Sequence, residues 1–207
     1  MTITAVLWDA DGVLQHARPG WRETMIGFGG EGFIDAVNDA ERGPLAGHGS
    51  FRTAIAELVR QRELTVDAGQ VLALWEQIDV DPGAMLLVKT LRKQGIRCYL
   101  ATNQHDERTS FMRTELRYGD HLDGQFYSSE MGVAKPSPAF FEHILADLAL
   151  PAAQVLFIDD LAENVAGAAA VGLSAAIHHP ASGAAGVRRI LADYRLLVDD
   201  SPLRPRP

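Results

Sequence analysis

The feature that most constrains the fold is a short apolar segment, residues 3–8, which ends abruptly in Asp9-Ala10-Asp11-Gly12. Such a segment is typical of a strand that is covered on both faces in the middle of a parallel sheet. From residue 82 onward, further apolar strands alternate with helical patterns. The predicted strands cover residues 98–101, 125–128, 155–158 and 173–177, and the predicted helices cover 82–94, 106–117, 139–148 and 163–171. This alternation predicts an α/β fold built on a doubly wound parallel sheet.

Residues 16–80 have a different character. Their apolar side chains recur at helical spacing, as in Ile55, Leu58 and Val59, and no convincing strand is found among them. The glycine-containing segments 27–30 and 44–49 are predicted turns between these helices. We therefore predict a helical domain of residues 16–80, inserted into a core domain made of residues 1–15 and 81–200. Residues 201–207 are rich in proline and are expected to form a disordered tail.

Composition and charge argue against several classes of protein. The chain has 19 Lys and Arg against 27 Asp and Glu, a net charge of −8, and no basic run, which argues against nucleic acids and anionic membranes as partners. Its single cysteine, Cys98, cannot form an internal disulfide, and no apolar run approaches the ~18 residues that span a bilayer. The first residues lack the basic start of a signal peptide. We expect a cytoplasmic protein.

Polar residues follow several of the predicted strands. In an open parallel sheet, ligands bind beyond the carboxyl ends of the strands, so these residues are the first candidates for a site. They are Asp9, Asp11, Thr102, Asn103, Asp159 and Asp160, together with Lys135 in the loop Lys135-Pro136-Ser137-Pro138. Four separate loops thus bring carboxylates, a hydroxyl and an ammonium group to one edge of the predicted sheet.

These residue types suit phosphoryl transfer. Three carboxylates at one site repel one another unless a hard cation neutralises them, and Mg²⁺ binds a few protein oxygens together with waters and phosphate. A lysine and a hydroxyl suit the oxygens of a phosphoryl group. One carboxylate can attack the phosphoryl group, and a second, two residues further on, can protonate the leaving oxygen and later deprotonate water. The sequence therefore predicts phosphoryl transfer with Mg²⁺ as the cofactor.

Four segments carry a resemblance to a known family. VLWDADGVL at 6–14, YLATN at 99–103, KPSP at 135–138 and FIDDLAEN at 157–164 match, in order, the four motifs of the haloacid dehalogenase-like hydrolase superfamily. The resemblance covers residues 3–178 and implies a Rossmann-like core, and the helical insert between the first two motifs resembles the C1-type cap of that superfamily. The Asp159-Asp160 pair with Asn164, and Glu41-Arg42-Gly43, resemble sugar-phosphate phosphatases related to glucose-1-phosphatase and to the phosphatase domain of soluble epoxide hydrolase.

The resemblance implies roles for the four aspartates. Asp9 is expected to be the nucleophile and a Mg²⁺ ligand. Asp11 is expected to be the general acid and base, with its backbone carbonyl also on the metal. Asp160 is expected to be the remaining protein ligand, with Asp159 as a near neighbour or a water-mediated support. Dehalogenases of the superfamily lack a carboxylate at the position of Asp11, so its presence here favours phosphate esters over haloacids.

The resemblance also implies a phosphate-binding set. Thr102 and Lys135 are expected to hold phosphoryl oxygens, and Lys135 to offset the charge of the carboxylates. Backbone amides near Ala10 and Asn103 are expected to complete the phosphate cradle. The side chains of Asn103 and Asn164 are expected to orient the loops that carry these groups.

The combined hypothesis is a Mg²⁺-dependent phosphatase that acts on a small phosphate monoester, with sugar phosphates as a candidate class. A phosphomutase of the same superfamily and a catalytically silent binding protein remain alternatives. A signalling receiver domain also uses Asp, Thr and Lys around a parallel sheet, but it needs neither a second Asp at this spacing nor a helical insert.

Candidate residues of the insert for contacting the leaving group are Trp21, Arg22, Arg42, His48 and Arg52, and the loop 43–49 is a segment that could enter the site. Other residues are given structural interpretations: Trp75 as core, the charged stretches 106–108 and 113–117 as a solvated helix face, and His178-His179 as a plain loop.

Overall fold

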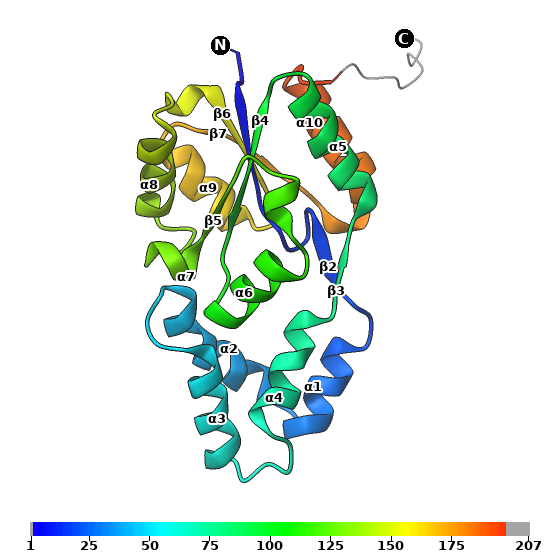
Figure 1. Ribbon diagram of the computed structural model, residues 1–207, viewed down its shortest axis with the longest axis vertical. Coiled ribbons are helices and arrows are strands. Elements are labelled where there is room, and N and C mark those ends of the chain that lie inside the picture. Colours follow the sequence, from blue (N-terminus) through cyan, green and yellow to red (C-terminus); the bar gives the residue numbers. More distant parts are fainter. Residues whose placement is uncertain (1, 198–207) are drawn as a thin grey trace.

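A five-stranded parallel sheet forms the centre of the computed structural model, which describes residues 2–197 (Figure 1). In spatial order the strands are β5 (Gly124–Tyr127), β4 (Arg97–Thr102), β1 (Ala5–Trp8), β6 (Val155–Asp159) and β7 (Ser174–Ile177). The first strand of the chain lies in the middle, where Trp8 pairs with Leu100 on one side and with Ile158 on the other. The predicted parallel α/β sheet is therefore confirmed. The predicted tail, 201–207, lies outside the described residues.

Both faces of the sheet are covered by helices because β1 is apolar on both faces. Val6 and Trp8 pack with α5 (Pro82–Lys93), α6 (Asp106–Thr114) and α10 (Gly183–Asp193). Ala5 and Leu7 pack on the opposite side with α8 (Pro138–Leu148) and α9 (Ala162–Ala170). Successive residues of a strand point to opposite faces, so a strand buried on both sides must be apolar throughout.

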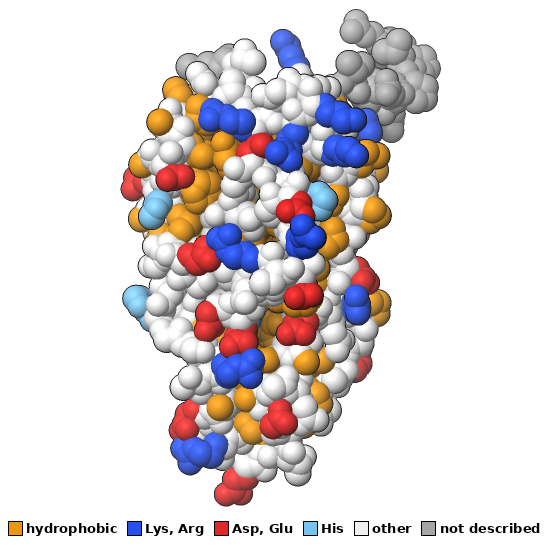
Figure 2. Space-filling view, in the orientation of Figure 1, with side chains coloured by type: hydrophobic (Ala, Val, Ile, Leu, Met, Phe, Trp, Pro, Cys, Tyr) orange, Lys and Arg blue, Asp and Glu red, His pale blue; other side chains and the backbone are white. Residues whose placement is uncertain are grey.

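Shorter elements complete the core. They are the helix α7 (Ser128–Met131) and three 3-10 helices, η2 (Tyr118–Asp120), η3 (Ala152–Gln154) and η4 (Pro180–Ser182). No helix among residues 2–197 is long and apolar enough to cross a membrane. On the face drawn in Figure 2, acidic and basic side chains are interspersed.

A helical lobe, residues 21–76, lies beyond one end of the sheet (Figure 1). It contains α1 (Trp21–Gly29), α2 (Phe33–Leu45), α3 (Phe51–Gln61), α4 (Ala68–Leu72) and the 3-10 helix η1 (Ala73–Glu76). Met25, Phe33, Phe51 and other buried residues form an apolar cluster of its own, separate from the two clusters that flank the sheet. The lobe thus has its own hydrophobic interior.

Two short strands join the lobe to the core, and the sequence prediction missed both. β2 (Gln15–Ala17) and β3 (Ile78–Val80) pair antiparallel, with Gln15 opposite Val80 and Ala17 opposite Ile78. We call this pair the β2–β3 ribbon. The expectation of no strand within residues 16–80 was therefore wrong, because three residues are too few for an alternating pattern to show.

Two predicted turns are partly helical. α1 continues through Gly27 to Gly29, and α2 continues through Pro44 to Leu45. In α1 the apolar side chains of Met25 and Phe28 pack into the interior of the lobe, which holds the helix together despite its glycines. Pro44 is buried in the last turn, and the helix ends one residue after it, as expected for a residue that cannot donate a backbone hydrogen bond.

Candidate active site

A buried cluster lies at the carboxyl ends of β1, β4 and β6. The ammonium group of Lys135 donates hydrogen bonds to Asp9 Oδ1 at 2.7 Å, to Asp159 Oδ2 at 2.7 Å and to the carbonyl oxygen of Ala101 at 3.0 Å. Asp9 follows β1, Ala101 belongs to β4, and Asp159 ends β6. Three parts of the chain far apart in sequence thus meet at one lysine from a fourth, and that lysine is buried.

The aim of Lys135 is set by its neighbour Asn103. The Asn103 side chain donates to the carbonyl of Lys135 and accepts from its backbone N–H, both at 2.9 Å. These two bonds fix the backbone of the Lys135 loop against the end of β4. Asn103 thus joins the end of β4 to the Lys135 loop.

Asp159 is held from several sides. Besides Lys135, it accepts from the backbone N–H of Leu161 at 2.8 Å and from the Asn164 amide at 3.0 and 3.1 Å. These hydrogen bonds fix the position of the Asp159 carboxylate. Asp159 therefore positions Lys135, and Asn164 in turn positions Asp159.

Asp160 is half-buried beside Asp9 and Asp159, and one oxygen from each of these three carboxylates lies within 4.8 Å of the other two. A Cβ built on Gly12 would overlap the Asp160 carboxylate, so only glycine lets the Asp9–Gly12 turn approach this closely. Gly12 also has φ +76°, a conformation that favours glycine.

The acidic group suits a divalent cation. Burial, opposed by Lys135 but reinforced by Asp159, raises the pKa of Asp9 to about 7. Burial and the charge of Asp159 also raise the pKa of Asp160. Burial alone would lower the pKa of Lys135, but the two carboxylates outweigh it and raise that pKa. One lysine is thus too little positive charge for three carboxylates, and oxygen ligands of this kind fit Mg²⁺.

Asp11 lies outside the lysine cluster, two residues after Asp9. It accepts from Arg108 Nη2 at 2.7 Å and from Gln15 Nε2 at 3.1 Å through Oδ1, and from Gln104 Nε2 at 2.7 Å through Oδ2. Gln104 Nε2 also donates to the Thr102 hydroxyl at 3.1 Å, so one amide bridges the two predicted residues. Ala10 is buried, and its carbonyl accepts the N–H groups of residues 13, 14 and 15, which shape the turn.

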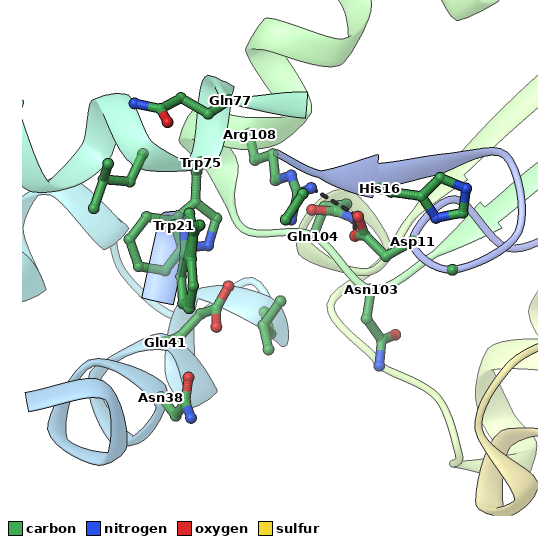
Figure 3. A pocket seen from close by; sticks show the side chains of 14 residues that line it. Asp11, His16, Trp21, Asn38, Glu41, Trp75, Gln77, Asn103, Gln104 and Arg108 are labelled. Atoms are coloured by element: carbon green, nitrogen blue, oxygen red, sulfur yellow. Dashed lines mark hydrogen bonds and ion pairs between the residues drawn. The ribbon is translucent and has the colours of Figure 1, made fainter. Parts of the chain in front are cut away.

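A cavity of about 460 Å³ opens from Asp11 toward the helical lobe (Figure 3). The core lines it with Asp11, Asn103, Gln104 and Arg108, and the ribbon with His16 and Ala17. The lobe lines it with residues that include Trp21, Asn38, Glu41, Leu45 and Trp75. The dashed line in Figure 3 marks the contact between Arg108 and Asp11 at its edge.

The lobe residues chosen from the sequence largely point elsewhere. Trp21 lines the cavity, but Arg42 is 80% exposed and pairs with Asp39, and Arg52 pairs with Glu107. Arg22 and His48 are exposed and do not line it. Trp75, predicted to be core, is buried and also lines the cavity. Of the loop 43–49, only Leu45 reaches the cavity.

The prediction of a solvated face for residues 106–108 was wrong. Arg108 has only 13% of its side chain exposed and binds Asp11. Asp106 accepts the backbone N–H of Phe51 in the lobe at 2.9 Å. A charged run looks solvated from its composition, and only the tertiary structure brings a lobe against it. Glu41, Gln104 and Arg108 were accordingly missed, although Gln104 directly follows Asn103.

Comparison with known proteins assigns the family. A profile of haloacid dehalogenase-like hydrolases matches residues 3–172. The chain belongs to the haloacid dehalogenase-like (HAD-like) hydrolases. The family resemblance seen in the sequence is thereby confirmed.

Two curated relatives of this HAD-like hydrolase are phosphatases. Sesquiterpene phosphatase astK of Aspergillus oryzae is 39% identical over 88 residues, which are 42% of this chain and 44% of that protein. A phosphoglycolate phosphatase of Pectobacterium atrosepticum is 26% identical over 190 residues, 82% of this chain and 77% of that protein. The first of these alignments spans less than half of the relative's length.

Solved structures show the same fold. A predicted HAD-like family hydrolase from Porphyromonas gingivalis superposes with a TM-score of 0.80 at 19% identity. The match covers 92% of this chain and 98% of that one.

Proposed function

We propose that this HAD-like hydrolase is a Mg²⁺-dependent phosphatase that hydrolyses a small phosphate monoester through an aspartyl-phosphate on Asp9. The observation that carries the proposal is the arrangement of two aspartates on one turn. Asp9 binds Lys135 in the buried cluster, whereas Asp11 lines the cavity. The phosphatase names of the curated relatives support the same reaction.

Asp9 is the proposed nucleophile. The Asp9 oxygen that does not bind Lys135 attacks phosphorus, and the bond from phosphorus to the leaving oxygen breaks. Lys135 keeps the nucleophile oriented, and its positive charge faces the phosphoryl oxygens. The Thr102 hydroxyl, the Lys135 ammonium and backbone amides near Ala10 and Asn103 are the proposed partners of those oxygens.

Asp11 is the proposed general acid and base. It gives a proton to the leaving oxygen in the first step and takes one from the attacking water in the second. The water oxygen then forms the new bond to phosphorus, and the bond to Asp9 breaks to regenerate the free carboxylate. Dehalogenation needs no such proton donor, so a carboxylate at this position supports phosphate-ester chemistry.

The proposed metal ligands are Asp9, Asp160 and the backbone carbonyl of Asp11, with Asp159 in support. Asp159 already accepts from Lys135, Leu161 and Asn164, which favours a supporting part over direct ligation. Bound Mg²⁺ would neutralise the carboxylates and polarise the phosphoryl group.

The lobe is the proposed cap, within residues 16–80, over a core of residues 1–15 and 81–200. Its side chains form one wall of the cavity into which Asp11 faces, so a leaving group attached to a phosphoryl group at Asp9 would meet them. A cap in this place can exclude bulk water during the first transfer. Sugar phosphates are candidate substrates on the resemblance of the fourth motif, and the buried, unpaired Cys98 fits the cytoplasm that we propose.

Hydrolysis of p-nitrophenyl phosphate tests the proposal. We expect activity that requires Mg²⁺, stops with EDTA, and falls at least about a thousandfold in Asp9→Asn, since the nucleophile is lost. Asp147→Asn, on the exposed face of α8, is the matched control and is expected to keep full activity. Wild-type rates in Asp9→Asn would contradict the nucleophile, and a requirement for a bisphosphate activator would indicate a mutase instead.

A further inference from the structure

The cavity wall opposite Asp11 carries a carboxyl group from the lobe that the proposed chemistry does not use. Glu41, on α2, has only 17% of its side chain exposed and lines the cavity, where its carboxyl group faces Arg108 and Asp11 (Figure 3). Its ion-pair partner is His105, whose Nε2 atom lies 3.7 Å from Glu41 Oε1, too far for a hydrogen bond. The Trp75 side chain also hydrogen-bonds to Glu41, but a largely buried carboxyl group without a close ion pair has room to bind a further hydrogen-bond donor.

Two buried N–H groups near Glu41 lack partners among the described residues. Arg108 lines the cavity and donates to Asp11 through Nη2, but its Nε has no hydrogen-bond partner there. His105 Nδ1 accepts from the backbone N–H of Arg108, which leaves the ring proton on Nε2, and Nε2 is also without a partner. Buried polar atoms are nearly always satisfied, and of these two residues Arg108 lines the cavity, so its side of the cavity has hydrogen-bonding capacity to spare.

A carboxyl group beside an N–H group without a partner favours a hydroxyl group as the ligand. A hydroxyl can donate to the Glu41 carboxyl and accept from Arg108 Nε, whereas an ammonium group would meet the positive charge of Arg108. A second carboxylate or phosphate would meet Glu41 and Asp11, and a hydrocarbon would leave both polar groups unsatisfied. Trp21 and Trp75 pack edge to face, with ring centroids 5.6 Å apart, and provide an apolar wall that suits the C–H face of a ring.

We propose that Glu41 and Arg108 together recognise a hydroxyl group of the leaving group, so that the enzyme prefers phosphorylated polyols or sugars to esters with a hydrocarbon or carboxylate leaving group. This inference rests on the phosphatase function proposed above. Because Arg108 also binds Asp11, the recognised hydroxyl lies next to the proton donor for the leaving oxygen. A site that binds a substrate hydroxyl in this way discriminates strongly against substrates without it, since the buried polar groups of the site would then stay unpaired.

The test compares two substrates of one shape, glucose 6-phosphate and cyclohexylmethyl phosphate, with phosphoglycolate as the carboxylate probe. We expect wild type to favour the sugar phosphate by about a hundredfold or more in kcat/KM over both others. Glu41→Met, which keeps the length of the side chain, should reduce that ratio at least about tenfold, and so should Arg108→Lys, which keeps the charge but loses Nε–H. Asp39→Asn, at an exposed position of α2, is the control and should leave the ratio unchanged.

Ratios between substrates cancel any effect of Arg108 on Asp11, since both reactions use the same acid. A wild type that favours the hydrocarbon or the carboxylate ester, or a ratio that survives Glu41→Met, overturns the inference while p-nitrophenyl phosphate hydrolysis still supports the phosphatase. Calorimetric binding to Asp9→Asn, with and without Glu41→Met, decides the question without turnover. Equal binding of the two ring esters to Asp9→Asn also overturns it.

Discussion

At the scale of single residues, one buried ammonium group organises the centre of the site. Lys135 bonds to both Asp9 and Asp159, but only Asp159 is further held by Leu161 and Asn164. The Asp159 carboxylate is therefore held by more hydrogen bonds than the Asp9 carboxylate. Asp159 is fixed as part of the framework, whereas the second carboxylate oxygen of Asp9 has no hydrogen-bond partner among residues 2–197, which leaves it available for the proposed attack.

The general acid can be tested by the quality of the leaving group. Asp11→Asn keeps the shape of the side chain but cannot supply a proton, so hydrolysis of an alkyl phosphate should fall by about a hundredfold or more. The loss should be smallest in the first step with p-nitrophenyl phosphate, whose leaving group needs no proton. Single-turnover kinetics with both esters measures this, and equal losses in that step would contradict the role of Asp11.

Glu41 should make stability depend on pH in a way that can be isolated. Burial raises its pKa from 4.5 to about 7, opposed by Arg108 and by a hydrogen bond from Trp75. The folded state therefore holds this proton more tightly than the unfolded state. Its contribution is complete below pH 4.5 and disappears as the pH rises through about 7.

Urea unfolding of wild type and Glu41→Gln at pH 5 and pH 8 measures the effect. Because Gln stays neutral, the free energy of unfolding of wild type relative to the variant should fall by up to about 3 kcal/mol between these values, at 1.36 kcal/mol for each unit of pKa shift. Parallel pH profiles for the two proteins would show that Glu41 ionises normally in the fold.

Position along the chain was enough to predict the central residues of the site. Asp9, Thr102 and Asp159 come directly at the ends of apolar strands, and parallel strands bring their carboxyl ends to one edge. Glu41 and Arg108 had no such signal. Each lies on a helix among other charged residues, and its burial depends on how the lobe meets the core, which no local pattern encodes.

At the scale of elements, α9 packs so closely on the Lys135 loop that it leaves no room for a methyl group. A Cβ on Gly167, within α9, would overlap the carbonyl oxygen of Pro136 and lie 3.3 Å from Phe141. The glycine therefore lets the helix support the loop that carries the lysine.

Gly167→Ala should lower the free energy of unfolding by about 1–3 kcal/mol and reduce kcat/KM, because the Lys135 loop must shift. Gly27→Ala is the matched control, since Gly27 is also helical but an added Cβ there would have nothing within 4 Å. Alanine at that position should stabilise by about 0.5–1 kcal/mol through its helix propensity. Urea unfolding and p-nitrophenyl phosphate assays separate the two, and similar behaviour of both variants would rule out the packing argument.

The alternation of strands and helices was predictable because each element of the sheet is long enough to show its period. The β2–β3 ribbon was not, since each strand has three residues and the pairing joins positions more than sixty residues apart. The helical ends at Gly29 and Leu45 were hidden for another reason. Glycine and proline usually end helices, and only packing inside the lobe overrides that tendency.

At the scale of the whole molecule, the first residues of α6 tie the lobe to the core. Asp106 accepts from the backbone of Phe51 at 2.9 Å, Glu107 pairs with Arg52 at 2.7 Å, and the ring of His105 packs on that of Phe51 with centroids 4.0 Å apart. Arg108, on the same helix, holds Asp11. One helix thus contacts both the lobe and the proposed general acid.

Metal binding should be visible as a gain in the stability of the whole protein. Mg²⁺ at a hundred times its dissociation constant should add about 2.7 kcal/mol to the free energy of unfolding, and the melting temperature should rise accordingly. Asp160→Asn should lose most of this rise. Without metal, however, it should melt no lower than wild type, because burial and Asp159 already disfavour the charge of Asp160.

Thermal melts with and without Mg²⁺ distinguish a lost ligand from a damaged fold. Asp147→Asn, whose side chain is exposed on α8, is expected to keep the full Mg²⁺ response. A normal Mg²⁺ response in Asp160→Asn would remove Asp160 from the proposed ligands.

The β2–β3 ribbon has a consequence for how such a molecule can diversify. Ala17 and Ile78 are paired neighbours, so the chain leaves the sheet and returns to it at a single place. The segment between these two strands can therefore be lengthened, shortened or replaced while the strands keep their register. A homologue with a different insertion could therefore differ in substrate preference while the carboxylates at the ends of β1 and β6 keep their positions.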